Sequence, residues 1–158
     1  MADKIPNQAI LVPVDFSPNS EEALVFAADL AARIEAPLAV LHVVHDPGEA
    51  PGYYARRDPQ LLSRIDDVAA EMMDEFLHSM IKAHPGLEII KKVHIKLVSG
   101  LPVTRILEVA DKTNPRMVVM GSKGRTGLSH LLLGSKAEQV VRLCPSPVTI
   151  IKMPKHDE

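Results

Sequence analysis

Glycines gather in one short segment of the sequence. Four of the eight glycines fall within residues 121–134, at Gly121, Gly124, Gly127 and Gly134. A glycine turn at the start of a helix leaves backbone N–H groups unpaired and lets an anion approach closely, and the helix dipole favours negative charge. Residues 112–137 also carry five basic side chains and no acidic one. The segment therefore predicts a phosphate-binding site, and the alternative is a tight turn in which the glycines are only steric.

Two common phosphate-binding motifs are absent from the sequence. A Walker A loop needs a lysine directly after its closing glycine, and the stretch Gly-Ser-Lys-Gly-Arg-Thr-Gly that begins at Gly121 does not provide one. A dinucleotide fingerprint needs G-x-G-x-x-G after the first strand, but residues 15–20 contain no glycine. We therefore expect neither a P-loop hydrolase nor a NAD-binding enzyme.

Few other residues suggest chemistry. Asp15 directly follows the first apolar run, where it could contact a ligand or cap the next helix. His42 and His45 lie three apart on an expected strand, so they face opposite sides and cannot share a metal unless the strand ends between them; we interpret them as structural or loop residues. Cys144 has no histidine and acid partners in sequence, and is expected to be a small buried apolar residue.

Five short apolar runs alternate with four helical patterns. Strands are expected over residues 9–14, 38–44, 93–98, 117–120 and 148–151. Helices are expected to begin at Pro18 after a Ser17 N-cap, and at Leu61, Pro102 and Leu128. The alternation predicts an α/β fold with an open five-stranded parallel sheet and helices on both faces. Local patterns leave two strand orders open, 3-2-1-4-5 and 2-1-3-4-5, and both place a ligand crevice at the carboxyl ends of the strands.

Size and charge limit the possible classes of protein. The 158 residues fit one domain, with a long loop over about residues 46–59 that includes the aromatic and basic cluster 53–57. Eighteen Lys and Arg against 20 Asp and Glu argue against bulk binding to nucleic acid or anionic membranes. No apolar run approaches the roughly 20 residues of a membrane span, and no signal peptide is visible. With its single cysteine, the chain is expected to be cytoplasmic.

The full glycine spacing resembles a family signature. Gly121-x2-Gly124-x9-Gly134-Ser135 follows Met-Val-Val-Met and precedes Pro-Val-Thr-Ile-Ile-Lys. Together with Leu-Val-Pro-Val-Asp-Phe-Ser at residues 11–17 and Leu-His-Val-Val at 41–44, this resembles the universal stress protein family, in its ATP-binding branch. The resemblance covers residues 10–152 and implies a Rossmann-like sheet with the strand order 3-2-1-4-5.

The resemblance also implies a role for individual residues. Asp15 would bind the ribose or a metal-bound phosphate, with Mg or Mn held indirectly, and no residue is assigned as catalytic. The adenine would be framed by Val43 with Pro13 and Val14, with the second strand meeting the base through its backbone, and the crevice wall would be formed by Met120 and Gly121. The phosphates would be bound by Gly124, Gly134 and Ser135, with Arg125 and Lys136 nearby.

Three functions follow from this hypothesis. The leading one is an ATP-binding regulatory protein of the stress response, whose nucleotide occupancy modulates its dimer or a surface for a protein partner. The alternative is a slow metal-dependent ATPase or a phosphoryl or nucleotidyl transferase. The third is a dimerisation module without nucleotide. The sequence does not distinguish ATP from AMP or a cyclic nucleotide.

The last strand is the expected dimer interface. In the order 3-2-1-4-5, residues 148–151 form a sheet edge with branched side chains and no internal charge or proline. Pro147 and Pro154 flank the strand without interrupting it. We therefore expect a homodimer paired through this strand, with Thr149 offering one of the pairing N–H groups.

Overall fold

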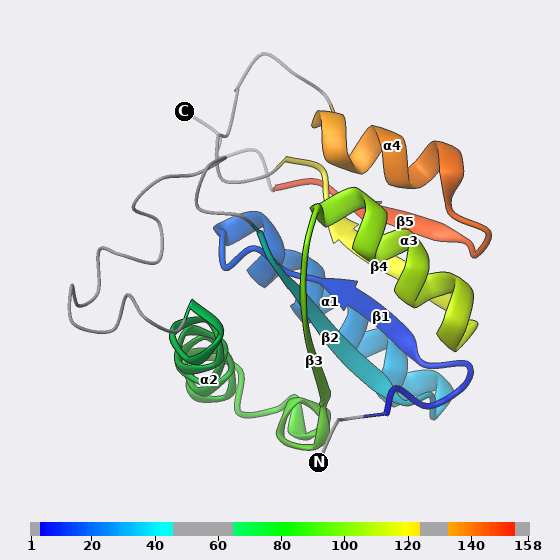
Figure 1. Ribbon diagram of the computed structural model, residues 1–158. Coiled ribbons are helices and arrows are strands. Elements are labelled where there is room, and N and C mark those ends of the chain that lie inside the picture. The colour runs from blue at the N-terminus through cyan, green and yellow to red at the C-terminus, as the bar shows by residue number, and fades with distance from the viewer. Residues whose placement is uncertain (1–3, 46–64, 124–132, 154–158) are drawn as a thin grey trace, which may run out of the picture.

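The strands form one parallel sheet. The computed structural model describes residues 4–45, 65–123 and 133–153. In these ranges five strands lie in the order β3-β2-β1-β4-β5 (Figure 1). Their bounds are β1 Ile10–Pro13, β2 Leu38–Val44, β3 His94–Ser99, β4 Met117–Gly121 and β5 Val148–Ile151. The predicted fold class is confirmed, and of the two strand orders left open by local patterns the structure has 3-2-1-4-5.

Helices cover both faces of the sheet. The described helices are α1 Pro18–Ile34, α2 Ile65–Ala83, α3 Pro102–Thr113 and α4 Ser135–Leu143, with a 3-10 helix η2 at Glu88–Lys92. One apolar cluster joins the sheet to α1, α2 and η2, and a second joins its other face to α3 and α4. Figure 1 shows α3 and α4 on one side of the sheet and α1 on the other. No helix in the described ranges has the length and apolar character to cross a membrane.

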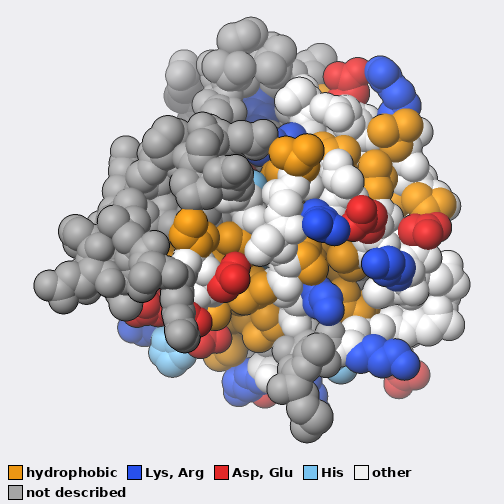
Figure 2. All heavy atoms as spheres, viewed as in Figure 1, with side chains coloured by type: hydrophobic (Ala, Val, Ile, Leu, Met, Phe, Trp, Pro, Cys, Tyr) orange, Lys and Arg blue, Asp and Glu red, His pale blue; other side chains and the backbone are white. Residues whose placement is uncertain are grey.

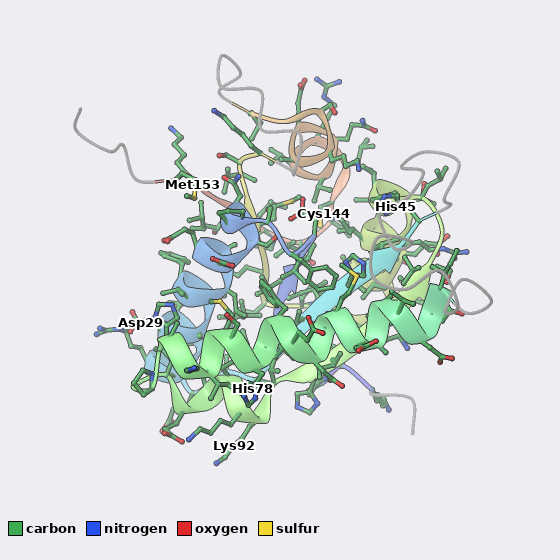
Figure 3. All side chains as sticks on the ribbon, turned by 90° about the vertical axis from the view of Figure 1, so that its left-hand side faces the viewer. Asp29, His45, His78, Lys92, Cys144 and Met153 are labelled. Carbon is green, nitrogen blue, oxygen red and sulfur yellow. The ribbon has the colours of Figure 1, made fainter. Side chains whose placement is uncertain are left out.

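The local signals explain most element boundaries. All seven residues of β2 are buried, because helices cover both faces of this interior strand. Ser17 caps α1 by accepting a hydrogen bond from the Ser20 N–H, and Pro18 occupies the first turn, as expected. α3 begins at Pro102, also as expected. Figure 3 shows α2 running across one face of the sheet with His78 on its outer side.

Several expectations differ from the structure. α4 is described from Ser135, and the helix expected from Leu128 does not include Gly134, because this residue is extended and its N–H donates to the Ser122 carbonyl at 2.6 Å, which ties it to the end of β4. η2 was not expected, because charged residues flank its two isoleucines in the sequence and no helical pattern is visible; Ile90 is buried in the apolar cluster with α1 and α2. Cys144 is partly exposed rather than buried, since it follows the last turn of α4.

Some predictions fall outside the described residues. These are the loop over residues 46–59 with its cluster 53–57, the first residues of the predicted second helix, Gly124 and Arg125 of the glycine segment, and residues 128–132 of the predicted fourth helix.

Candidate functional site

A cavity opens at the carboxyl ends of β1, β2 and β4. Its volume is about 410 Å³, which lies within the usual range for sites that bind small molecules. β1 has β2 on one side and β4 on the other, so the order of the chain reverses here, as it does at ligand crevices of open α/β sheets. Nine of the eleven predicted site residues line the cavity: Pro13, Val14, Asp15, Val43, Met120, Gly121, Gly134, Ser135 and Lys136. The other two, Gly124 and Arg125, lie outside the described residues.

The turn after β1 holds Asp15 at the cavity. Oδ1 of Asp15 accepts hydrogen bonds from the Ser17 N–H at 3.0 Å, from the Ser17 hydroxyl, and from the Ser20 hydroxyl at 2.6 Å. The Asp15 N–H donates to Oγ of Ser20 at 2.9 Å. The N-cap of α1 is Ser17 and not Asp15, so the alternative role of Asp15 as the cap is wrong. The carboxylate instead orders the turn through one oxygen while the residue lines the cavity.

β2 presents a peptide edge to the cavity. In the parallel register Pro13 is opposite Leu41, and the Val14 N–H donates to the Leu41 carbonyl at 2.8 Å. Peptide direction alternates along a strand, so the N–H and C=O of Val43 also point to the β1 side. β1 ends at Pro13, and Val43 therefore turns one donor and one acceptor toward the cavity. The His45 ring contacts the Val43 carbonyl, with Nδ1 at 3.4 Å.

The first turn of α4 forms the opposite wall. Ser135, Lys136 and Ala137 line the cavity, and their N–H groups belong to a first turn without intrahelical acceptors. No side chain caps this helix, because its N-cap is Gly134. α1, in contrast, has a serine cap. The uncapped donors and the helix dipole make this end of the cavity favourable to an anion.

Gly121 has a packing role in addition to its place in the wall. A Cβ atom on this residue would lie 2.7 Å from Cβ and 3.0 Å from the backbone oxygen of Asn19. Real Cβ atoms do not approach so closely, so glycine is needed where α1 crosses the end of β4. The glycine at this position is therefore explained by helix–sheet contact whether or not a ligand is bound.

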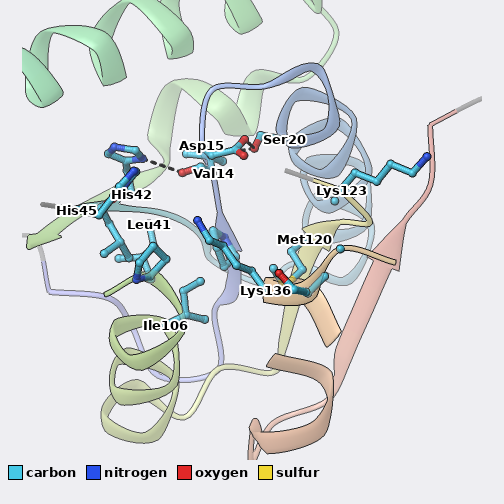
Figure 4. Close-up of a pocket in the computed structure, with 17 residues that line it drawn as sticks. Val14, Asp15, Ser20, Leu41, His42, His45, Ile106, Met120, Lys123 and Lys136 are labelled. Atoms are coloured by element: carbon cyan, nitrogen blue, oxygen red, sulfur yellow. Dashed lines mark hydrogen bonds between the residues drawn. The ribbon is translucent and has the colours of Figure 1, made fainter. Parts of the chain in front are cut away.

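Charge is distributed unevenly around the cavity. Figure 4 shows Lys123 and Lys136 on the β4 and α4 side, and His42 and His45 on the β2 side. Asp15 is the only carboxylate among the described residues that line the cavity. In the described ranges no group of three His, Cys, Asp or Glu side chains could hold a metal ion by itself. Elsewhere, on the face seen in Figure 2, acidic and basic side chains are intermingled.

Sequence reasoning missed several residues that line the cavity. They are Ser20, Leu41, His42, His45, Pro102, Ile106, Lys123 and Ala137. Ser20 could have been found, since it lies in the first turn of the helix that follows Asp15. Pro102 and Ile106 carry no local signal, because only the three-dimensional fold brings α3 to this cavity. His42 is structural as interpreted, since its ring is buried and bonded to the backbone, yet it also lines the cavity.

Comparisons with known proteins agree on one family. Residues 6–152 match the model of the universal stress protein family. The chain is 32% identical to the universal stress protein MJ0531 of Methanocaldococcus jannaschii, over 94% of this chain and 84% of that protein. Its fold matches a universal stress protein of Archaeoglobus fulgidus in complex with dAMP, with a TM-score of 0.60, 23% identity and coverage of 94% and 100% of the two chains. It also matches a universal stress protein in complex with cAMP, with a TM-score of 0.61, 22% identity and coverage of 93% and 98%. The chain therefore belongs to the universal stress protein family.

Proposed function

We propose that the chain binds an adenine nucleotide in this cavity and acts as a regulatory protein of the stress response. The observation that carries the proposal is the pairing of two complementary walls. One wall is the uncapped first turn of α4 with Lys136, and the other is the outward-facing peptide of Val43. The adenine nucleotides held by two solved members of the family support the same assignment.

The base would lie against β2. The edge of adenine presents an acceptor at N1 and a donor at its amino group, which complement the N–H and C=O of Val43. Pro13, Val14, Leu41 and Ile106 supply apolar surface around this position. The base end of the cavity therefore has the hydrogen-bonding groups and the apolar contacts that adenine needs.

The phosphates would lie at α4. The N–H groups of Ser135, Lys136 and Ala137, the hydroxyl of Ser135 and the ammonium group of Lys136 supply the donors and the charge. The N–H of Gly134 is already bonded to Ser122, so this residue contributes by its lack of a side chain. Gly124 and Arg125 remain predicted contributors. Asp15 would bind the ribose hydroxyls or act indirectly through Mg or Mn on the phosphates.

Regulation is favoured over turnover. Rapid hydrolysis needs a general base aligned with a water, and Asp15, the only carboxylate among the described lining residues, has one oxygen committed to its turn. The second candidate is a slow metal-dependent ATPase or transferase that uses ATP with Mg. Phosphate release measured with and without Mg separates the two: binding without metal-dependent turnover supports the regulatory role.

The released ligand tests the proposed function. Freshly purified protein is denatured, and any small molecule set free is identified by mass spectrometry, with ATP, AMP and cyclic AMP as standards. Calorimetric titration of emptied protein with each nucleotide follows. Co-purified or titrated adenine nucleotide is the expected result. Failure to bind any of the three in both measurements would contradict the proposal.

We further propose that the protein pairs as a homodimer through β5, so that nucleotide occupancy can alter the dimer. β5 is a sheet edge and contains no charged residue, whereas the opposite edge strand β3 carries His94 and Lys96. α4, which contacts β5, carries exposed apolar side chains, with Val141 at 46% and Leu143 at 59% exposure. Charge on one edge and its absence on the other favour β5 as the pairing edge.

Register corrects the expected role of Thr149. The N–H of Val118 donates to the Pro147 carbonyl and that of Ser122 to the Ile151 carbonyl, so residues 147, 149 and 151 face β4. The peptide of Thr149 therefore lies inside the sheet, and Ile150 presents its N–H at the free edge. Ile150→Pro should yield monomer in light scattering, whereas the control Ile150→Val should not. A dimer of unchanged strength in Ile150→Pro would place the interface elsewhere.

A further inference from the structure

His42 is a buried polar residue in the strand next to the cavity. Its side chain lies in β2 with the residue only 2% exposed, and Nδ1 lies 2.8 Å from the carbonyl oxygen of Val14. Figure 4 shows this contact as the dashed line. A carbonyl oxygen can only accept a hydrogen bond, so Nδ1 carries the proton. The imidazole is thus a donor to the backbone at the point where β1 ends.

This bond replaces a bond of the sheet. The Val14 N–H donates to the Leu41 carbonyl, which continues the β1–β2 register by one residue. An uninterrupted parallel ladder would next join the Val43 N–H to the Val14 carbonyl. No such backbone bond exists between these two described residues, and the His42 ring satisfies the carbonyl instead. The N–H of Val43 is thereby left for the cavity.

An aromatic contact holds the ring in place. The Phe16 ring lies over the His42 ring, with centroids 4.3 Å apart and planes inclined by 31°. The Phe16 ring also contacts the Phe76 ring, with centroids 5.5 Å apart. Phe16 has a positive φ of 65°, a conformation that costs a non-glycine residue roughly 1–3 kcal/mol. The strained turn is stabilised by this ring packing. The chain therefore leaves the sheet at Val14 with both its backbone and the imidazole fixed.

We propose that His42 is a positioning residue for base recognition. By donating to the Val14 carbonyl, it keeps the Val43 N–H available as the donor that reads the base. Adenine has an acceptor at the corresponding ring position, whereas guanine has a donor there, so this arrangement selects adenine over guanine. The inference rests on the proposed function, and it assigns a role that is separate from contact with the nucleotide.

Two matched variants test the inference. His42→Phe keeps an aromatic ring beside Phe16 but removes the donor, and His42→Asn keeps an N–H donor at the same branch of the side chain. ATP, GTP and inorganic tripolyphosphate are titrated into each protein, and thermal unfolding checks that each is folded. His42→Phe should weaken ATP binding by about tenfold and reduce the preference for ATP over GTP, as expected for one hydrogen bond. Its affinity for tripolyphosphate should stay within about twofold, because that ligand has no base to contact Val43, and His42→Asn should restore the preference for ATP.

Amide hydrogen exchange provides a second readout without ligand. In His42→Phe the Val43 N–H should bond the Val14 carbonyl and exchange more slowly than in the wild-type protein, by about tenfold if one hydrogen bond is gained. Unchanged exchange, or an unchanged ATP-to-GTP ratio, would overturn the positioning role while leaving nucleotide binding intact. A wild-type protein that binds neither ATP nor tripolyphosphate would instead contradict the proposed function, and the role in base recognition with it.

Discussion

Ser135→Pro should remove a proposed phosphate donor without disturbing the helix that carries it. Ser135 is the first residue of α4, a position where proline is tolerated because its missing N–H has no intrahelical acceptor. The preceding residue must be extended, and Gly134 has φ −67° and ψ 155°. Ser135 is also exposed, so we expect the free energy of unfolding to change by no more than about 0.5 kcal/mol.

The effect on binding follows from the lost donors. A hydrogen bond to a charged group contributes about 1.5–3 kcal/mol, so the loss of the N–H should weaken ATP binding by about 10- to 150-fold. Ser135→Ala loses only the hydroxyl and is the matched control, with a smaller loss expected. Calorimetric titration with ATP measures both variants. Equal affinities of Ser135→Pro and Ser135→Ala would show that the Ser135 N–H does not bind the phosphates and would refute the reasoning.

Three further predictions concern neighbouring residues. Gly121→Ala should lower the free energy of unfolding by about 1–3 kcal/mol through overpacking against Asn19. The control Gly86→Ala should not, because an added Cβ there meets nothing within 4 Å. Equal changes in the thermal unfolding of the two variants would contradict the packing role of Gly121. Gly134→Val should abolish nucleotide binding in a folded protein by blocking the approach of phosphate to α4, and unchanged affinity in calorimetry would exclude that approach. Asp15→Ala should weaken ATP binding in the presence of Mg more than AMP binding; equal losses would assign Asp15 to the ribose, and no loss would leave it only its role in the turn.

Much of the fold could be predicted because a parallel strand with helices on both faces has a continuous run of apolar residues in its sequence. The bounds of β2, which is fully buried, agree with the expected residues 38–44 for this reason, and those of the partly buried edge strand β5 also agree with the expected residues 148–151. The expected helix over residues 128–143 is wrong at Gly134, where the bond to Ser122 keeps the chain extended just before α4. Local periodicity does not contain that long-range contact.

The site was only partly predictable for a related reason. Asp15 and Gly134 mark strand and helix ends, where backbone groups are unpaired, and such ends are visible in sequence. Ile106 is part of the cavity only because the strand order brings α3 to it. The direction of the Thr149 peptide depends on register with β4, and the bond from His42 to Val14 depends on where β1 leaves the sheet. These features are set by pairing between strands, which residue types alone do not specify.

A map of backbone amide shifts on addition of ATP tests the central claim most directly. In a two-dimensional nitrogen–proton NMR titration, the amides of Val43, Ser135, Lys136 and Ala137 should shift together in a saturable manner, because they line the two walls of one cavity. Amides of α2 should shift little, because α2 packs on the face of the sheet opposite to α3 and α4. Saturable shifts of other amides, with no shift at Val43 or in the first turn of α4, would contradict the account.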